Sequence, residues 1–316
     1  MTLPKKYELK IGSLALKSPT LLAPMEAVNS ESFIKTCAHY SCGLVSTQAI
    51  ESVEDNFYDL ESLKKIPSPV SFQIMTNKAE TALELAKLVE PFVDVIDFNF
   101  GCPLKKTLGE KKGGYLLQFP HLIKRIVEPV VKAVNIPVSI KIRLGFDKDR
   151  ETFLEIGRLA ESIGVSAITL HARYVKDGYR GKADWEKIKE LKKSSGIPVI
   201  ANGDIFKPGQ AKMLLDQDYC DGVMLGRGAK NNPSIFLSIK EVLESLPEEK
   251  RTEVSAKEIF NFFYEDFVSS SDNLHQLQDH ASWFVSGEKN ASWLKQRIKE
   301  KSSFEEIKLF INKNIN

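Results

Sequence analysis

The residue best placed for chemistry is Cys102, which lies in a Gly-Cys-Pro turn directly after the apolar run Val95–Phe100. A lone cysteine is most often a small core residue, but a rigid Gly-Pro turn is not the interior of a packed strand. Asn99, at the end of the same run, would share its surroundings. Cys102 is therefore a candidate acid or nucleophile. The other three cysteines lack such a setting and are expected in the core: Cys37, Cys42 and Cys220.

Two further side chains interrupt or end apolar segments. Lys141 lies within the run Val138–Leu144, where an unpaired ammonium would be costly to bury. It either reaches the rim, pairs with a buried carboxylate, or faces an anionic ligand atom such as the N1 edge of a reduced flavin. His171 ends the run Ala167–Arg173. It is either a hydrogen-bonded core histidine or a ligand-facing group.

Two small-residue turns follow the last two apolar runs. The first is Asn202-Gly203-Asp204 and the second is Gly226-Arg227-Gly228. Each turn taken alone is equally well explained as a tight turn. Together they offer exposed backbone N–H groups and one guanidinium, which suit a phosphate monoester.

The elements that must position these residues alternate in type along the chain. Short runs rich in Val, Ile, Phe and Thr alternate with helix-like stretches such as 79–89, 120–134, 150–163, 185–193 and 208–215. Asn77 and Asp184 are candidate capping residues for two of these helices. The eight strand-like runs are 20–24, 44–50, 70–75, 95–100, 138–144, 167–173, 199–204 and 222–228.

Eight strand–helix repeats over about 240 residues predict an α/β fold, a (β/α)₈ TIM barrel. A doubly wound sheet is disfavoured because no G-x-G-x-x-G follows the first strand. After a closing helix over 238–246, every apolar cluster from Val254 onward has helical spacing. We therefore expect a catalytic barrel over residues 1–246 and a small all-helical C-terminal domain over residues 247–316. In a barrel, the polar residues named above would meet at the C-terminal ends of the strands.

Composition excludes several classes of protein. The 316 residues are 42% hydrophobic and 27% charged, with a formal net charge of +2, which is ordinary for a globular protein and indicates no global affinity for nucleic acid. No C-x-x-C pair or H-E-x-x-H motif predicts a disulfide framework or a metal site. No apolar run is long enough for a signal peptide or a membrane span. We expect a metal-free cytoplasmic protein.

Positive charge is nevertheless concentrated locally. Segments 104–113 and 173–182 hold eight Lys or Arg against two acids, and both would emerge at the C-terminal face of the barrel. Either these are two solvated loops, or they form a basic rim for a polyanion. Tyr174 and Tyr179 within the rim offer rings on which bases can stack.

Six ordered motifs follow the predicted strands, and a seventh segment lies near the C-terminus. The motifs are APM after the first strand, NFGCP after the fourth, KIRLGF in the fifth, LHAR with GYRGKADW after the sixth, ANGDI after the seventh and LGRGAKNNPSIF after the eighth; the C-terminal segment is HASWFVSGEKNASWLKQRI. Together they resemble the tRNA-dihydrouridine synthases, and the resemblance covers nearly the whole chain.

The resemblance implies an FMN-dependent enzyme that uses NADPH or NADH to reduce the C5=C6 bond of selected uridines in tRNA. Cys102 would protonate uracil C5 while flavin N5 delivers hydride to C6. Asn99 would face the uracil, and Arg143 would lie close to the flavin or the substrate. The basic rim adds four candidate tRNA contacts, Lys105, Lys106, Arg173 and Arg180. The implied cofactor-binding residues are Pro24, Met25, Glu26, Gln73, Lys141, His171, Asn202, Gly203, Asp204, Gly226 and Arg227.

Two other functions are compatible with parts of this pattern. One is a flavin-dependent barrel acting on a free pyrimidine, similar to dihydroorotate dehydrogenase, although a small acid needs neither a basic rim nor a helical tail. The other is a tRNA-binding protein without redox activity, which would have no need of Cys102, Lys141 or the phosphate-binding turns. We expect the tRNA-modifying enzyme, acting as a monomer.

Overall fold

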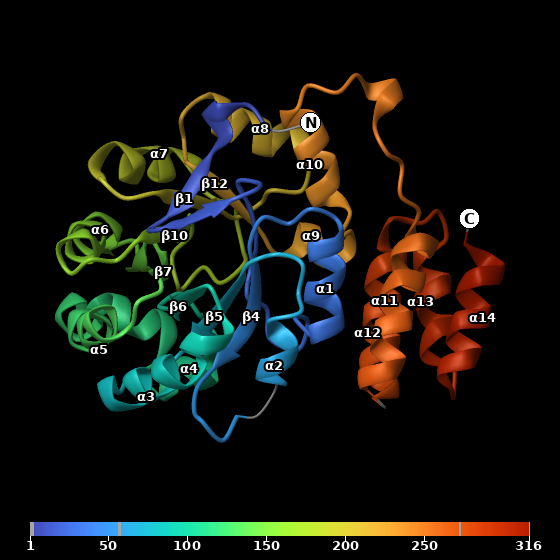
Figure 1. Ribbon diagram of the computed structural model, residues 1–316, viewed down its shortest axis with the longest axis horizontal. Coiled ribbons are helices and arrows are strands. Elements are labelled where there is room, and N and C mark those ends of the chain that lie inside the picture. The colour runs from blue at the N-terminus through green and yellow to red at the C-terminus, as the bar shows by residue number, and fades with distance from the viewer. Residues whose placement is uncertain (1–2, 56–57, 272, 316) are drawn as a thin grey trace.

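The central element of the computed structural model, which describes residues 3–55, 58–271 and 273–315, is a parallel eight-stranded sheet (Figure 1). Its strands follow the order β3-β12-β11-β10-β7-β6-β5-β4. Each lies within one of the eight runs predicted from the sequence. Their bounds are β3 Thr20–Leu22, β4 Val45–Ile50, β5 Val70–Ile74, β6 Val95–Asn99, β7 Val138–Arg143, β10 Ala167–His171, β11 Val199–Asn202 and β12 Gly222–Leu225.

The sheet closes on itself between its first and last strands. Leu21 of β3 forms a parallel bridge with Leu44, just before β4, and the Leu22 N–H donates to the Leu44 carbonyl at 2.9 Å. At this seam Gly43 donates its N–H to the Thr20 carbonyl at 2.9 Å. The predicted TIM barrel is thus confirmed.

We expect Gly43→Ala to destabilise the protein by about 3 kcal/mol or more, because the seam has no room for a methyl group. A Cβ at this position would overlap the carbonyl oxygen of Ser18 and lie 2.9 Å from that of Thr20. Thermal unfolding measures the loss. The matched control is Gly209→Ala, where nothing lies within 4 Å of the added methyl. Equal melting temperatures for the two variants would contradict this packing.

Helices surround the barrel between successive strands. All six helices predicted for the barrel are present, the closing one as α10, and Asp184 caps one of them by accepting from the Glu186 N–H. Asn77 is not a cap; Lys78 occupies that position, and the Asn77 amide instead donates to the Glu110 carbonyl. The barrel helices are α1 Glu31–His39, α2 Leu60–Leu63, α3 Ala79–Val89, α4 Lys105–Gly109, α5 Pro120–Ala133, α6 Phe153–Ser162, α7 Trp185–Ser194, α8 Pro208–Asp216, α9 Arg227–Asn231 and α10 Ile235–Leu243.

Two short hairpins complete the barrel. The hairpin β1 (Leu9–Ile11) and β2 (Leu14–Leu16) packs against the inward-facing residues Leu21, Val95 and Ile200. It therefore covers the end of the barrel opposite the C-terminal ends of the strands. The second hairpin pairs β8 (Gly145–Asp147) with β9 (Arg150–Glu151). Because β9 occupies the start of the predicted helix 150–163, α6 begins at Phe153 instead.

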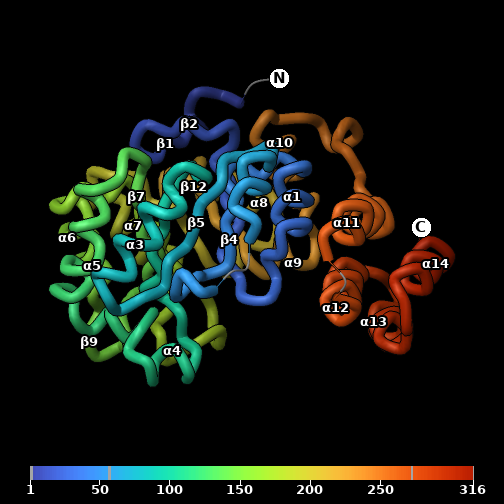
Figure 2. Tube along the Cα trace, turned by 60° about the horizontal axis from the view of Figure 1, so that its bottom comes forward, coloured from blue at the N-terminus to red at the C-terminus, as the bar shows by residue number. Residues whose placement is uncertain are grey.

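The last part of the chain is helical throughout, as predicted, and forms a second lobe beside the barrel (Figures 1 and 2). Its helices are α11 Ala256–Ser270, α12 Leu274–Phe284, α13 Ala291–Lys299 and α14 Phe304–Asn314. The predicted boundary at residues 246 and 247 falls between α10 and α11. That the two lobes are separate domains stays a prediction.

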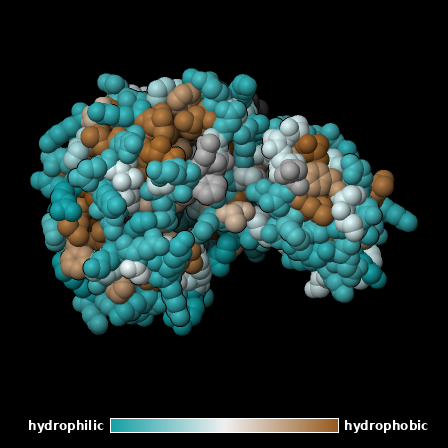
Figure 3. Space-filling view, turned by 90° about the horizontal axis from the view of Figure 1, so that it is seen from below, coloured by the Kyte–Doolittle hydropathy of each residue, from teal (hydrophilic) through white to brown (hydrophobic). Residues whose placement is uncertain are grey.

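The helical lobe docks on α1 and α9. Asp266 of α11 accepts from the Ser32 hydroxyl at 2.7 Å and pairs with Lys35 at 2.9 Å. The ring of His280 stacks on Phe263 and packs near Phe33 of the barrel. Seen from below, a hollow separates the two lobes, and the visible surface is mostly hydrophilic (Figure 3). Among the described residues, no helix is both long and apolar enough to cross a membrane.

Candidate active site

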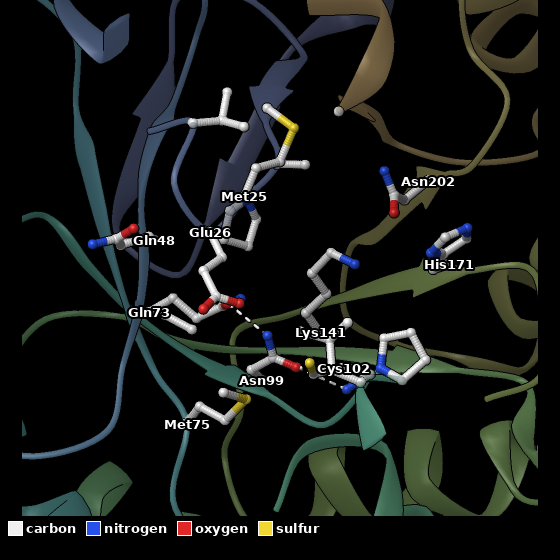
Figure 4. A pocket seen from close by; sticks show the side chains of 18 of the residues that line it. Met25, Glu26, Gln48, Gln73, Met75, Asn99, Cys102, Lys141, His171 and Asn202 are labelled. Atoms are coloured by element: carbon white, nitrogen blue, oxygen red, sulfur yellow. Dashed lines mark hydrogen bonds between the residues drawn. The ribbon is translucent and has the colours of Figure 1, made fainter. Parts of the chain in front are cut away.

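A cavity of about 1120 Å³ lies at the C-terminal ends of the barrel strands (Figure 4). It reaches the helical lobe, since Gln276 of α12 lines it together with Lys230 of the barrel helix α9. Most of the predicted site residues meet here. Those that line the cavity are Pro24, Met25, Glu26, Gln73, Asn99, Cys102, Lys106, Lys141, Arg143, His171, Asn202, Gly203, Asp204, Gly226 and Arg227; Lys105, Arg173 and Arg180 do not.

The turn that carries Cys102 is held by hydrogen bonds on both sides. The Asn99 side-chain oxygen accepts from the N–H groups of Gly101 and Cys102 at 3.0 and 2.9 Å. The Cys102 carbonyl accepts from the Gly114 N–H at 3.0 Å. The thiol itself is partly exposed to the cavity and donates to the Thr107 hydroxyl at 3.4 Å. This arrangement holds the sulfur at the cavity wall.

A buried polar chain connects that turn to the interior of the barrel. The Asn99 amide donates to the Gln73 side-chain oxygen at 2.8 Å, and the Gln73 amide donates to Asp97 at 2.6 Å. Asp97 also accepts from the Ser139 hydroxyl at 2.7 Å. Burial raises the pKa of Asp97 above its ordinary value despite these donors. These hydrogen bonds set the orientation of the Asn99 side chain, which then holds the backbone of Gly101 and Cys102.

Lys141 projects its amine into the cavity from β7 (Figure 4). Burial, reinforced by the nearby Arg143 guanidinium, lowers the pKa of Lys141 to about 8. The amine is therefore largely protonated at neutral pH, in a place where an anionic ligand atom would gain strongly from it.

Arg143, two residues further along the same strand, is almost wholly buried. Its guanidinium donates to the carbonyls of Gly101 at 2.8 Å, Tyr174 at 3.1 Å and Gly178 at 2.7 Å. Burial lowers its pKa to about 10, which leaves it charged at neutral pH. Arg143 thus joins the Cys102 turn to the segment after β10, besides lining the cavity.

His171 is neutral and its tautomer follows from its neighbour. Burial, together with the Arg143 cation, holds the pKa of His171 well below its ordinary value. The Arg173 guanidinium lies 3.1 Å from His171 Nε2. Because a guanidinium can only donate, Nε2 accepts and the ring hydrogen is on Nδ1. His171 therefore retains one N–H donor at the cavity wall.

The turn after β11 binds two arginines. Asp204 has a φ of 58°, and its carboxylate accepts from Arg173 at 2.6 Å and from Arg227 at 3.0 Å. Burial alone would raise the pKa of Asp204, but the hydrogen bond from Arg173 and its charge hold it below its ordinary value. Gly203 has a φ of 113°, and a Cβ there would lie 2.9 Å from the Ala183 methyl. The predicted Gly203 is thus sterically required.

The predicted basic rim is divided between surface and interior. Lys105, Lys106 and Arg180 are exposed, and Lys106 lines the cavity. Arg173 is buried and bound to Asp204, so it is not on the surface. Lys112, which was not singled out by sequence, also lines the cavity and pairs with Glu51 and Glu110.

Two polar groups of the site were missed in the sequence. Asp97 is the only carboxylate in the apolar run Val95–Phe100. An acidic residue inside a predicted buried strand is visible in the sequence and could have identified it as a site residue. Thr107 had no such signal, since its proximity to Cys102 depends on the short helix α4. Among the described residues, no three His, Cys, Asp or Glu side chains are grouped to hold a metal ion.

Comparison with known proteins places the chain in a family. The family model described as "Dihydrouridine synthase (Dus)" matches residues 21–315. The tRNA-dihydrouridine synthase B of Pasteurella multocida is 33% identical over 289 residues, covering 88% of this chain and 87% of that protein. A probable tRNA-dihydrouridine synthase of Rickettsia conorii is 33% identical over 90% of this chain and 89% of that protein.

Solved structures of other proteins share the fold at low sequence identity. An old yellow enzyme homologue from Zymomonas mobilis superposes with a TM-score of 0.55 at 12% identity, over 79% of this chain and 94% of that one. Morphinone reductase in complex with tetrahydroNAD also gives 0.55, at 14% identity over 76% and 91% of the two chains. The family expected from the sequence motifs is confirmed, and the chain belongs to the dihydrouridine synthase family of oxidoreductase enzymes.

Proposed function

We propose that this protein binds FMN in the cavity and reduces the C5=C6 bond of specific uridines in tRNA, with Cys102 as the proton donor. The observation that carries the proposal is that the Cys102 side chain, the Lys141 amine and the Asn99 amide line the same cavity. NADPH or NADH is the proposed reductant. Membership of the dihydrouridine synthase family supports the reaction as a whole.

The residues present fit a flavin mononucleotide. Lys141 supplies a cation and His171 Nδ1 a donor at the cavity wall. At the ends of β11 and β12, Gly203, Gly226 and the exposed Arg227 provide a guanidinium and open backbone for a phosphate. Pro24 and Met25 line the wall where an isoalloxazine ring would lie, with Gln73 at its polar edge. When bound, the cofactor would supply a hydride to uracil C6.

The protein's own residues would perform the rest of the reaction. Asn99 would orient the uracil, because its side chain is fixed by Gln73 on one side and by the Cys102 turn on the other. Cys102 would hold a proton at Sγ and give it to C5. A thiol in this position is suited to the task since general acid catalysis requires a proton within reach of the reacting carbon.

The target base must leave the tRNA stack to reach this cavity, at a cost of a few kcal/mol. We propose that the rim residues Lys105, Lys106 and Arg180, together with the C-terminal helices 256–314, bind the tRNA backbone and offset that cost. Gln276 of the helical lobe lines the cavity together with Lys230 of α9, and a hollow lies between the two lobes (Figure 3).

The direct test is product formation. Unmodified tRNA transcript is incubated with the flavin-loaded protein and NADPH, and the nucleosides are analysed by mass spectrometry. We expect a uridine converted to dihydrouridine, two mass units heavier. Binding of the transcript with no dihydrouridine formed, under conditions in which the flavin is reduced, would overturn the proposal.

The rim predicts a salt dependence. We expect Lys105→Gln with Lys106→Gln to weaken tRNA binding and to reduce the slope of log Kd against log salt by roughly 1 to 2, because each lost phosphate contact removes about 0.7 to 0.9. Filter binding over a series of salt concentrations measures this. Lys10→Gln, on the exposed hairpin at the opposite end of the barrel, is the matched control. An unchanged slope in the double variant would exclude these lysines from the interface.

A further inference from the structure

The hydroxyl of Thr107 is bonded to the thiol of Cys102. The Cys102 Sγ donates to Thr107 Oγ1 at 3.4 Å, and Cys102 is the only hydrogen-bond partner of that hydroxyl among the described residues. Thr107 is buried, on the first turn of α4, while the thiol beside it faces the cavity. The hydroxyl hydrogen is therefore not committed to any other acceptor in this part of the chain.

The backbone holds the pair in contact. The carbonyl of Cys102 accepts from the Gly114 N–H at 3.0 Å, and the carbonyl of Thr107 accepts from the Lys112 N–H at 3.0 Å. Gly113 has a φ of 56° and covers both residues so closely that a Cβ on it would lie 2.9 Å from Cys102 Cβ and from Thr107 Cγ2. Lys112, Gly113 and Gly114 therefore hold Cys102 and Thr107 together, so their contact is a fixed feature of the fold.

We propose that Thr107 is a positioning residue for the acid, accepting the S–H before proton transfer and donating its own hydroxyl hydrogen to the thiolate afterwards. The inference rests on the proposed role of Cys102. In the step, the S–H bond breaks and a C–H bond forms at C5 with the electron pair of the C5=C6 bond, while C6 takes the hydride supplied by the reduced cofactor. The thiolate then regains its proton from water.

A hydroxyl is suited to both states because it can rotate between accepting and donating. The charged groups that face the sulfur are Lys141 and Arg143, both from β7. Lys106 and Lys112 line the same cavity from the opposite segment. These cations act through space, whereas Thr107 adds a directed hydrogen bond to the sulfur itself.

The test uses Thr107→Val, which keeps the shape and removes the hydroxyl, and Thr107→Ser, which keeps the hydroxyl. The first readout is alkylation of Cys102 by iodoacetamide as a function of pH, with no tRNA or cofactor required. The other three cysteines are buried and serve as an internal background. We expect the alkylation rate near pH 8 to fall about tenfold in Thr107→Val and to recover in Thr107→Ser, the size expected for one hydrogen bond to a charged group.

The second readout is the rate at which tRNA reoxidises the reduced flavin in a single turnover. We expect Thr107→Val to slow this rate about tenfold with tRNA affinity unchanged, and to have no further effect in a Cys102→Ala background. Equal alkylation profiles for Thr107→Val and the parent protein, or failure of Thr107→Ser to restore them, would overturn the role of Thr107. A Cys102→Ala variant with full turnover would instead overturn the acid assignment, and the alkylation readout keeps the two outcomes separate.

Discussion

Replacement of Cys102 by alanine is expected to lower the rate of dihydrouridine formation by about 10²- to 10⁴-fold, the usual contribution of a positioned general acid. In the turn Gly101-Cys102-Pro103 the thiol is the one side chain that carries a transferable proton, and the neighbouring Asn99 amide is not acidic. Flavin content and tRNA affinity should persist, because the turn is held by backbone and Asn99 contacts that alanine leaves in place. The measurement is single-turnover product formation.

A matched control separates this effect from a general loss of thiols. Cys220→Ala removes a buried cysteine that does not line the cavity, so we expect near-normal turnover at some cost in stability. Unchanged product formation by Cys102→Ala would contradict the assignment of this residue as the acid.

Replacement of Lys141 by methionine is expected to lower the reduction potential of the bound flavin by about 30 to 60 mV. The ammonium would favour the anionic reduced form about 10- to 100-fold, and a tenfold change for a two-electron couple corresponds to about 30 mV. Lys141 is protonated below its pKa, which is about 8 before an anion binds beside it. As the pH rises above that value the Lys141 amine loses its charge. The difference in flavin reduction potential between the parent protein and Lys141→Met should therefore become smaller.

The potential is measured by anaerobic titration with a reference dye from pH 6 to pH 10. Lys106→Met is the matched control, because Lys106 also lines the cavity but lies exposed in α4 at its rim. Its potential should equal that of the parent protein. A Lys141→Met variant with an unaltered potential across this pH range would exclude an electrostatic contact between Lys141 and the cofactor.

The barrel could be predicted because its strands are buried on both faces and therefore stand out as short apolar runs. Several of the elements that sequence did not predict are short or polar. Helix α4 spans five residues within a lysine-rich segment. In β1 and β2, the alternation of apolar and polar residues covers only three residues per strand, too few to predict a strand. Residues 150–151 were expected in a helix but pair with β8, a contact set by the turn between them.

The site was predictable to the extent that strand ends converge in a barrel. Sequence could not tell which basic residues fold inward. Arg173 lies in a charged segment that predicts a surface rim. It is buried because it pairs with Asp204, 31 positions further along the chain. Arg143 likewise reaches the carbonyls of Tyr174 and Gly178, and only the closed barrel brings them together. The contact between Cys102 and Thr107 required the geometry of α4.

The central claim is that tRNA is the electron acceptor of a flavin bound in this cavity. The most direct measurement is anaerobic: the bound flavin is reduced, tRNA lacking dihydrouridine is added, and reoxidation is followed in the visible spectrum, with orotate in a parallel sample. The account predicts fast reoxidation by tRNA and none by orotate. Reoxidation by orotate alone would make the protein an enzyme of free pyrimidines, and a protein that binds tRNA but no flavin would be a binding protein; either result would contradict the account.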